Sequence, residues 1–300
     1  MRPPPGGGAE WFAGADGHRL RAAIFAPAGA PRGSVVVSPG RSEFIEKYYE
    51  VIGELQGRGF AVLVHDWRGQ GLSERLLADR LRGHAVGVGD FVSDYRALLD
   101  RFEARLPKPW INLSHSMGGA LTTMALLEGE RRFAGSFLSA PMFGLNTGRF
   151  PTFIARRVTW FAARYGFAGA VVPIGEAPGV RLTHDEARER LWRSQYEAFP
   201  DLQLGGFTWG WLDAAFHAVG RLGRDRRLKD IDHPVVVLAA EFEDLVSNPA
   251  SAGVAGRIPK GRFLEIEGAF HELLMETDAI RTRVWAEFDT LADQVTPRPA

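Results

Sequence analysis

Six short runs of almost continuous apolar residues are spaced along this chain, and segments of helical periodicity lie between them. Strands buried on both faces need such runs, whereas strands with one solvated face alternate apolar and polar residues. The alternation of such strands with helices predicts an α/β fold, a mostly parallel sheet with helices on both faces. The expected strands cover residues 34–38, 60–66, 110–114, 133–140, 234–240 and 262–269.

A hairpin is expected to open the fold. The stretch WFAGADGHRLRAAIF places Asp16 and Gly17 between two alternating segments, and Asp-Gly is a favoured hairpin turn. Residues 1–9 are rich in Pro and Gly and lack the apolar core of a signal peptide, so they are predicted to form a flexible leader. Further along, Asp90 is a plausible N-cap for a helix whose apolar residues recur as far as Leu106.

One long segment breaks the alternation. From Pro141 to Leu228 no strand is predicted, and aromatic and arginine residues are frequent. This favours a helical cap, residues 141–228, inserted into a core made of residues 10–140 and 229–295. One face of its first helix would carry Phe150, Phe153, Ile154, Val158, Phe161 and Tyr165, with Arg149, Arg156, Arg157 and Arg164 largely off that face.

Composition excludes several classes of function. The formal net charge is zero, so no overall field favours nucleic acid or anionic membranes. The absence of cysteine excludes disulfides, thiol catalysis and cysteine-rich metal sites. No apolar run approaches the roughly 18 residues that span a bilayer. A soluble cytoplasmic protein is therefore expected.

Two serines, Ser114 and Ser116, stand one residue apart in the stretch LSHSMGGA. WINLS before them is a strand pattern and MGGALTTMALLEG is a helix pattern, so Ser116 falls at a strand-to-helix turn. Such a turn lifts a hydroxyl above the carboxyl edge of the sheet, whereas Ser114 should point into packed protein. The turn needs small residues two positions before and after its centre, which Ser114 and Gly118 provide. Ser116 is the predicted nucleophile.

A serine hydroxyl needs a base, and the base needs a carboxylate to orient it. In a fold of this kind these groups follow the nucleophile in the order acid, then histidine. The segments EFEDLVSN and FHELLMETD each follow a late strand, at the edge where open α/β sheets bind ligands. His271 is the predicted base and Asp244 the predicted acid, with Glu241 and Glu243 as competing carboxylates. His217 is the strongest alternative base.

Two backbone N–H groups are expected to bind the developing oxyanion. The N–H of Met117 stands at the N-terminus of the helix that follows the nucleophile. The second donor should come from the loop SPGRSEFIEKYYE after an early strand, where Gly40 allows close approach of the backbone. The N–H of Arg41 is the candidate, and a plain Pro-Gly turn is the alternative.

Five motifs in a fixed order now carry a family resemblance. The segments SPGRSEFIEKY, HDWRGQGLSER, SHSMGGA, EDLVSN and GAFHELLMET resemble the monoacylglycerol lipases and bacterial lysophospholipases of the α/β-hydrolase group, over about residues 34–275. Two positions depart from the family pattern. Ser38-Pro39 stands where the family often has a histidine, and Ser114 replaces the first glycine of the turn around the nucleophile.

The resemblance implies an α/β-hydrolase fold with an inserted helical cap and hydrolysis of carboxylic esters through an acyl-enzyme, with no cofactor and no metal. By motif, it assigns the nucleophile to Ser116, the acid to Asp244, the base to His271 and the oxyanion donors to Arg41 and Met117. Glu43 and the segment from Asp66 to Gly69 look like supporting structure in which Asp66 and Arg68 brace loops.

The expected partner is a small ester with an acyl chain, such as a lysophospholipid or a monoacylglycerol. The candidates for an acyl-chain pocket are Phe150, Phe153, Phe161, Trp209 and Trp211, and packing of the cap's own core is the alternative for each. Transient contact of the cap with a membrane surface is a further expectation, whereas binding of nucleic acid is not expected.

Three rival functions are weighed against the esterase. An aminopeptidase of the same fold would need a cap carboxylate to hold a free amine, for which Glu176, Asp185 and Glu186 are available. A dehalogenase or epoxide hydrolase would need Asp in place of Ser116. A non-catalytic binding protein on this scaffold would usually have lost one member of the triad, but all three residue types are present.

Overall fold

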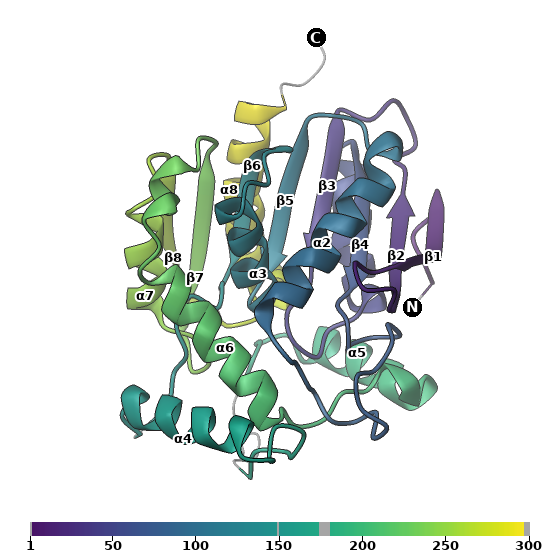
Figure 1. The fold of residues 1–300 in the computed structure, drawn as a ribbon. Coiled ribbons are helices and arrows are strands. Elements are labelled where there is room, and N and C mark those ends of the chain that lie inside the picture. Colours follow the sequence, from purple (N-terminus) through teal and green to yellow (C-terminus); the bar gives the residue numbers. More distant parts are fainter. Residues whose placement is uncertain (1, 149, 174–180, 297–300) are drawn as a thin grey trace.

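The computed structural model of the chain describes residues 2–148, 150–173 and 181–296. Its centre is an eight-stranded sheet with the order β1-β2-β4-β3-β5-β6-β7-β8 (Figure 1). β1 and β2 pair antiparallel, as do β2 and β4, and all the other pairs are parallel. The strands are β1 (Gly7–Ala13), β2 (Arg19–Phe25), β3 (Gly33–Ser38), β4 (Phe60–Asp66), β5 (Trp110–His115), β6 (Phe133–Ser139), β7 (Val235–Phe242) and β8 (Gly261–Phe270).

Helices cover both faces of this sheet, as the apolar strand sequences require. They are α1 (Tyr49–Gly57), α2 (Val88–Phe102), α3 (Met117–Leu127), α4 (Thr152–Arg164), α5 (Glu186–Ala198), α6 (Trp209–Leu222), α7 (Asn248–Ala255) and α8 (Asp278–Val295). Short 3-10 helices are η1 (Ile45–Tyr48), η2 (Glu103–Arg105), η3 (Pro200–Leu202), η4 (Arg226–Asp230) and η5 (Leu273–Met275). α1 and α8 pack on one face of the sheet, and α2, α3, α6 and α7 pack on the other.

The prediction of an α/β fold with a mostly parallel sheet is confirmed, as are the six strands and the opening hairpin. Five of the six strands are buried as expected, whereas β8 lies at the edge of the sheet and is largely half-buried or exposed. Two predictions at the N-terminal side were wrong. β1 begins at Gly7 and pairs with β2, so part of the predicted leader forms the edge strand of the sheet. α2 begins at Val88 with Gly87 as its N-cap, and Asp90 lies in its first turn, where its carboxylate is 3.8 Å from the Arg68 guanidinium.

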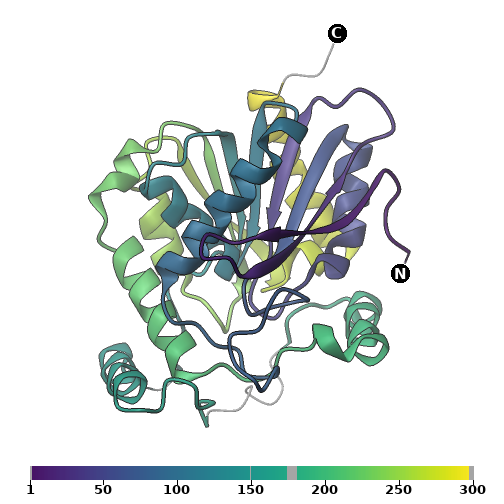
Figure 2. The same cartoon turned by 45° about the vertical axis from the view of Figure 1, so that its right-hand side comes forward.

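The segment between β6 and β7 holds α4, α5 and α6 and no strand among its described residues. α6 packs in the main core through buried residues such as Trp211 and Ala215, on the sheet face that α2 and α3 also cover. α4 and α5 lie apart from one another, beyond the same edge of the sheet (Figure 2). This is the edge at which Ser116 joins β5 to α3.

Among the described residues, no helix combines the length and the apolar character that crossing a bilayer requires.

We expect the aromatic cluster beneath β4 and β6 to contribute strongly to stability. The Phe288 ring is fully buried and lies edge-on to Phe60 and Phe137, with centroids 6.0 and 5.4 Å away. Phe288→Ala should lower the free energy of unfolding by roughly 3–5 kcal/mol because it opens a cavity. Phe199→Ala, at a ring that is 61% exposed, should change it by about 0.5 kcal/mol or less. Equal shifts of the urea midpoint in the two variants would contradict this expectation.

Candidate active site

The backbone at Ser116 makes the sharp turn predicted between β5 and α3. Ser116 has φ 48° and ψ −116°, a conformation that a residue with a side chain rarely adopts. Hydrogen bonds to the end of β6 hold it there: the Ser116 N–H donates to Ser139 O at 3.0 Å, and its carbonyl accepts from the Met142 N–H at 2.9 Å. The turn leaves the Ser116 side chain partly exposed, where a substrate can reach it.

Two small residues allow this turn, as the sequence pattern required. A Cβ on Gly118 would lie 2.5 Å from Pro39 O and would also collide with Ser38 O, so the loop after β3 packs directly on the turn. Ser114 is fully buried and donates to Asn112 Oδ1 at 2.6 Å. Its hydroxyl is thus engaged within the core, and Ser116 alone of the two serines faces outward.

The carboxylate on His271 comes from Glu243, and this corrects the pairing of His271 with Asp244. His271 Nδ1 lies 2.7 Å from Glu243 Oε2. Glu243 follows β7 directly, and its other oxygen accepts the N–H groups of Leu245 and Val246 at 2.8 and 3.1 Å, which turns the carboxylate toward the histidine. Asp244 is exposed.

The third competing carboxylate is engaged elsewhere. Glu241 lies within β7 and accepts the Gly268 N–H of β8 at 2.7 Å. Of the three acidic side chains in this segment, Glu243 alone is turned toward the histidine.

The electrostatics of the pair favour a charged imidazole facing a charged carboxylate. Burial alone would lower the pKa of His271, but the hydrogen bond and charge of Glu243, with Glu272 and Glu43 nearby, raise it above its ordinary value. Burial alone would raise the pKa of Glu243, but His271 and two backbone N–H groups lower it. His271 is therefore suited to accept a proton while Glu243 stays ionised.

His271 lies close to the turn that carries Ser116. The ring of His115, the residue before the turn, is 4.8 Å from the His271 ring between centroids. None of the described residues hydrogen-bonds the Ser116 hydroxyl. Catalytic hydrogen bonds are often long without substrate, so this does not exclude proton transfer between the two.

A buried charged cluster that the sequence pattern does not predict as a unit lies beside the histidine. Lys47 Nζ contacts Glu43 Oε1 at 2.6 Å and Glu272 Oε1 at 2.7 Å. His115 Nε2 lies 3.6 Å from each of these carboxylates, and burial lowers the pKa of His115 despite their charge. Glu272 directly follows His271, and Lys47 is four residues after Glu43. These two spacings are the sequence features from which the cluster could have been predicted.

Three side chains of this cluster are of the types that bind metal ions. One ligand atom each from Glu43, His115 and Glu272 lies within 4.8 Å of the others. The ammonium of Lys47, however, lies between the two carboxylates and hydrogen-bonds both. The charge that a cation would neutralise is thus already met by a lysine, so this donor set does not fit a resident metal.

The predicted oxyanion donor, Arg41, lies in the first part of the segment SPGRSEFIEKYYE, and residues 39–42 are called the oxyanion loop below. Hydrogen bonds on either side of Arg41 hold this loop. The Gly40 N–H donates to the Glu43 carboxylate, and the Ser42 N–H donates to Gln70 Oε1 at 2.6 Å. Arg41 reaches toward the cap, where its guanidinium donates to Gly205 O at 2.6 Å and lies 5.1 Å from the Trp211 ring. The oxyanion loop packs against Gly118, and therefore against the start of α3, where Met117 lies.

The predicted bracing residues also make the contacts expected of them. Asp66 accepts the N–H groups of Ile45 and Leu72, both at 2.9 Å, and so ties the loop after β4 to η1. The guanidinium of Arg68 donates to Asp94 and to Asp16. These contacts hold the loops that surround the turn at Ser116.

The five predicted acyl-pocket residues divide into two groups. Phe150, Phe153 and Phe161 are 67%, 71% and 47% exposed, so they form neither a closed pocket nor the cap's own core. Trp209 is half-buried at the start of α6, and Trp211 is buried against Phe207, beneath the Arg41 side chain. Of these residues, Trp211 lies beside the oxyanion loop, with its ring 5.1 Å from the Arg41 guanidinium. Arg149 and Glu176 lie outside the described residues.

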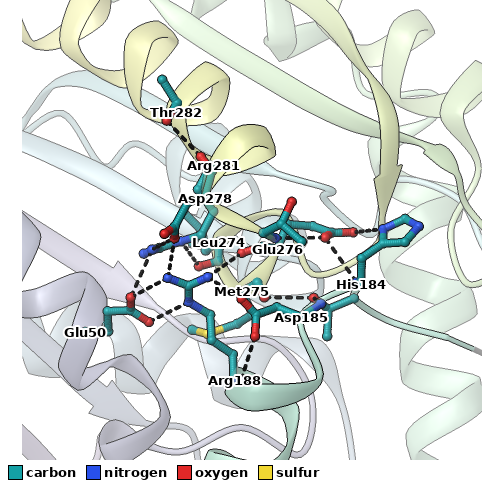
Figure 3. Close-up of polar contacts among 12 residues, drawn as sticks. Glu50, His184, Asp185, Arg188, Leu274, Met275, Glu276, Asp278, Arg281 and Thr282 are labelled. Carbon is teal, nitrogen blue, oxygen red and sulfur yellow. Dashed lines mark hydrogen bonds and ion pairs between the residues drawn. The ribbon is translucent and has the colours of Figure 1, made fainter.

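The cap is fastened to the loop that carries His271, as Figure 3 shows for its polar contacts. Glu276 is fully buried and accepts from His184 Nδ1 at 2.9 Å and from the Phe270 N–H at 2.9 Å. The His184 ring stacks on Phe270 with a centroid separation of 4.2 Å. The Glu272 N–H donates to Leu182 O at 2.8 Å, which joins the residue after the histidine to the cap backbone.

A second fastening lies at the start of α5, in the centre of Figure 3. The Arg188 guanidinium contacts Glu50 at 2.7 Å, Asp185 at 2.6 Å and Asp278 at 2.6 Å. It thereby connects the cap to α1 and α8. The half-buried position of Arg188 strengthens these charge-assisted contacts relative to fully exposed ion pairs.

The chain is similar to several known enzymes. The Hydrolase_4 family model, described as serine aminopeptidase S33, matches residues 29–278. Lysophospholipase L2 of Escherichia coli K12 is 35% identical over 269 residues, which cover 83% of this chain and 76% of that protein. Monoglyceride lipase of Rattus norvegicus is 25% identical over 282 residues, 92% of this chain and 87% of the relative.

Solved structures share the architecture at lower identity. A soluble variant of monoglyceride lipase from Saccharomyces cerevisiae, in complex with a substrate analog, has a TM-score of 0.77 at 16% identity, covering 99% of this chain and 98% of that one. A thermostable carboxyl esterase from Bacillus coagulans, in complex with glycerol, has a TM-score of 0.77 at 16% identity, covering 98% and 100%. At these identities the likeness establishes the fold alone.

The assignment of the acid can be tested with two neighbouring substitutions. Glu243→Gln should lower kcat roughly 10³- to 10⁴-fold, because the amide can neither fix the imidazole tautomer nor stabilise the imidazolium. Asp244→Asn, its matched control, should stay within about twofold of wild type because that side chain is exposed. Steady-state hydrolysis of an aryl ester measures both. The reverse ranking would return the role to Asp244.

The pH profile tests the influence of the buried cluster on His271. A general base must be neutral to accept a proton, so activity should be present above the pKa of His271 and lost as the pH falls through it. Because that pKa is raised, the acid limb of kcat/KM should lie above the ordinary imidazole value of about 6.5. Glu272→Gln removes one of the charges that raise it and should move this limb to lower pH. An unmoved limb in a folded, active variant would show that Glu272 does not act on His271.

Proposed function

The chain belongs to the Hydrolase_4 family, serine aminopeptidase S33, and has the α/β-hydrolase fold, and from this premise we propose that it is a serine hydrolase of single-chain carboxylic esters. Ser116 is the proposed nucleophile, His271 the base and Glu243 the acid. The single observation that carries the proposal is the hydrogen bond between His271 and Glu243 beside the strained turn at Ser116. A binding protein would have no need for a base of raised pKa beside an outward serine.

In the first step of the proposed reaction, Ser116 Oγ attacks the carbonyl carbon of the ester while His271 Nε2 takes its proton. Negative charge then develops on the carbonyl oxygen, and the N–H groups of Met117 and Arg41 are the proposed donors. The acyl–oxygen bond breaks, and the imidazolium returns the proton to the departing alcohol. The acyl group is left on Ser116.

In the second step, a water molecule attacks the acyl-enzyme. His271 removes one proton from this water, and the tetrahedral intermediate collapses with transfer of that proton to Ser116 Oγ. The products are a free carboxylic acid and the regenerated serine. Glu243 remains ionised throughout and stabilises the imidazolium in both steps.

The proposed substrates are lysophospholipids and monoacylglycerols. This rests on the 35% identity with lysophospholipase L2 and on the likeness to monoglyceride lipases, whose names refer to esters that carry one acyl chain. Trp211 is the best placed of the predicted acyl-chain contacts because its ring lies 5.1 Å from the guanidinium of Arg41 in the oxyanion loop.

Contact of the cap with a lipid surface is part of this proposal. α4 contains no acidic residue, and its exposed face carries Phe153, Val158 and Phe161. An amphipathic helix of this kind can lie in the interface of a micelle or bilayer. That arrangement would bring a membrane-bound ester to the edge of the sheet where Ser116 lies.

An aminopeptidase of the same fold is less well supported. Among the described residues, the predicted amine-binding carboxylates are already paired. Asp185 caps α5 and contacts Arg188, and Glu186 contacts Arg190 at 3.1 Å. Both carboxylates therefore already pair with arginines instead of facing a substrate amine.

We expect hydrolysis rates on aryl esters to rise from acetate toward laurate, because a longer chain can bury more apolar surface. Ser116→Ala should be inactive throughout the series. A monoacylglycerol presented in micelles should be hydrolysed faster than a soluble monoacylglycerol. The double variant Phe153→Ser with Phe161→Ser should reduce the rate on micelles and leave the rate on the soluble ester unchanged.

Other outcomes would redirect the proposal. Activity confined to acetate and butyrate would indicate a small-ester carboxylesterase. Activity on aminoacyl arylamides would favour the aminopeptidase. Failure of a fluorophosphonate to label wild type at Ser116 would favour a binding protein.

A further inference from the structure

A pocket lies between α4 and the end of α6, away from Ser116. Its volume is about 390 Å³, and it is lined by Arg156, His217, Gly220, Arg221, Arg224 and Asp225. Arg221 Nη1 contacts Glu128 Oε1 at 2.7 Å, and Glu128 follows the C-terminal end of α3, whereas Ser116 precedes its N-terminal end. A helix of eleven residues is about 16 Å long, so the pocket is separate from the catalytic site.

Three of the lining residues lie on one face of α6, and a fourth lies just beyond its end. His217, Gly220 and Arg221 follow one another at i, i+3 and i+4, and Arg224 lies in the turn after the helix. A Cβ on Gly220 would lie 3.5 Å from Arg156 Nη1 and 3.7 Å from its Cζ, so the Arg156 guanidinium lies directly over the glycine. Gly inside a helix costs about 0.5–1 kcal/mol relative to Ala. Here it makes room for a guanidinium at the pocket.

The pocket carries an excess of positive charge. Its single carboxylate, Asp225, accepts from Arg227 at 2.6 Å, and this contact above all holds the pKa of Asp225 down at about 2. Arg221 is paired with Glu128. The guanidinium groups of Arg156 and Arg224 make no hydrogen bond or ion pair with any other described residue. Two cations therefore face the pocket without a counter-charge among the described residues.

We propose that this pocket binds a phosphate group, as a monoester or a diester. Guanidinium groups match phosphate oxygens in a two-pronged geometry, and Arg156 and Arg224 approach the pocket from different elements. His217 Nε2 lies 3.8 Å from Asp213 Oδ1, and its other ring nitrogen, Nδ1, is proposed as a further donor. The phosphate belongs either to a phospholipid head group, beside the exposed apolar face of α4, or to a free phosphate monoester. The proposal does not depend on the esterase activity.

Binding of inorganic phosphate to the purified full-length protein tests the site, with calorimetry at constant ionic strength. The paired substitution R156M and R224M should weaken binding at least tenfold because it removes two charge-assisted contacts. Arg157→Met is the matched control, since Arg157 is exposed on the same helix and does not line the pocket. It should bind as wild type does. Gly220→Leu should also abolish binding, because the leucine side chain fills the space beneath Arg156 while every charge is kept.

Competition then separates the two sources of phosphate. Displacement by glycerophosphocholine, a diester head group without acyl chains, would assign the pocket to phospholipids. Displacement by glycerol 3-phosphate alone would assign it to free monoesters. The absence of phosphate binding in wild type would overturn the proposal, and so would equal affinities in wild type, the paired variant and Gly220→Leu.

Discussion

The carboxylate of Glu43 is the contact on which the arrangement of the catalytic edge depends. It is buried, and it accepts hydrogen bonds from the Gly40 N–H, from Lys47 and from the Tyr48 hydroxyl. Burial alone would raise the pKa of Glu43, but the charge of Lys47 above all lowers it to about 2. Lys47 in turn binds Glu272, the residue after His271. One buried anion thus connects the oxyanion loop to the loop that carries the base.

Through this connection, Glu43 and Glu272 help to raise the pKa of His271. Buried charges are stable only when each is paired and hydrogen-bonded, so the members of the cluster fix one another's positions. The turn at Ser116 is held in a different way, by backbone hydrogen bonds to the end of β6 and by the contact between Gly118 and the loop after β3. Both devices rigidify the edge of the sheet at which hydrolysis is proposed.

Much of this could be predicted from sequence, because buried parallel strands and the turn at Ser116 have local signatures. Apolar runs and a strand-to-helix junction depend on neighbouring residues alone. The choice among Glu241, Glu243 and Asp244 depends instead on where β7 ends and how the chain turns afterward. Periodicity cannot supply that path, so the sequence predicts Asp244 although Glu243 faces the histidine. Likewise, an aromatic face on α4 has the same pattern whether it is covered or exposed.

The attachments of the cap reach both halves of the catalytic edge. Tyr196 donates to Ser42 O at 2.8 Å and Arg41 donates to Gly205 O, while Leu182 O accepts from Glu272 beside the histidine. The cap is therefore not a module that evolution or an engineer could exchange alone. A transplanted cap would have to reproduce partners for the oxyanion loop and for the histidine loop together. Changes in substrate preference should accordingly arise more readily within the existing cap than by its replacement.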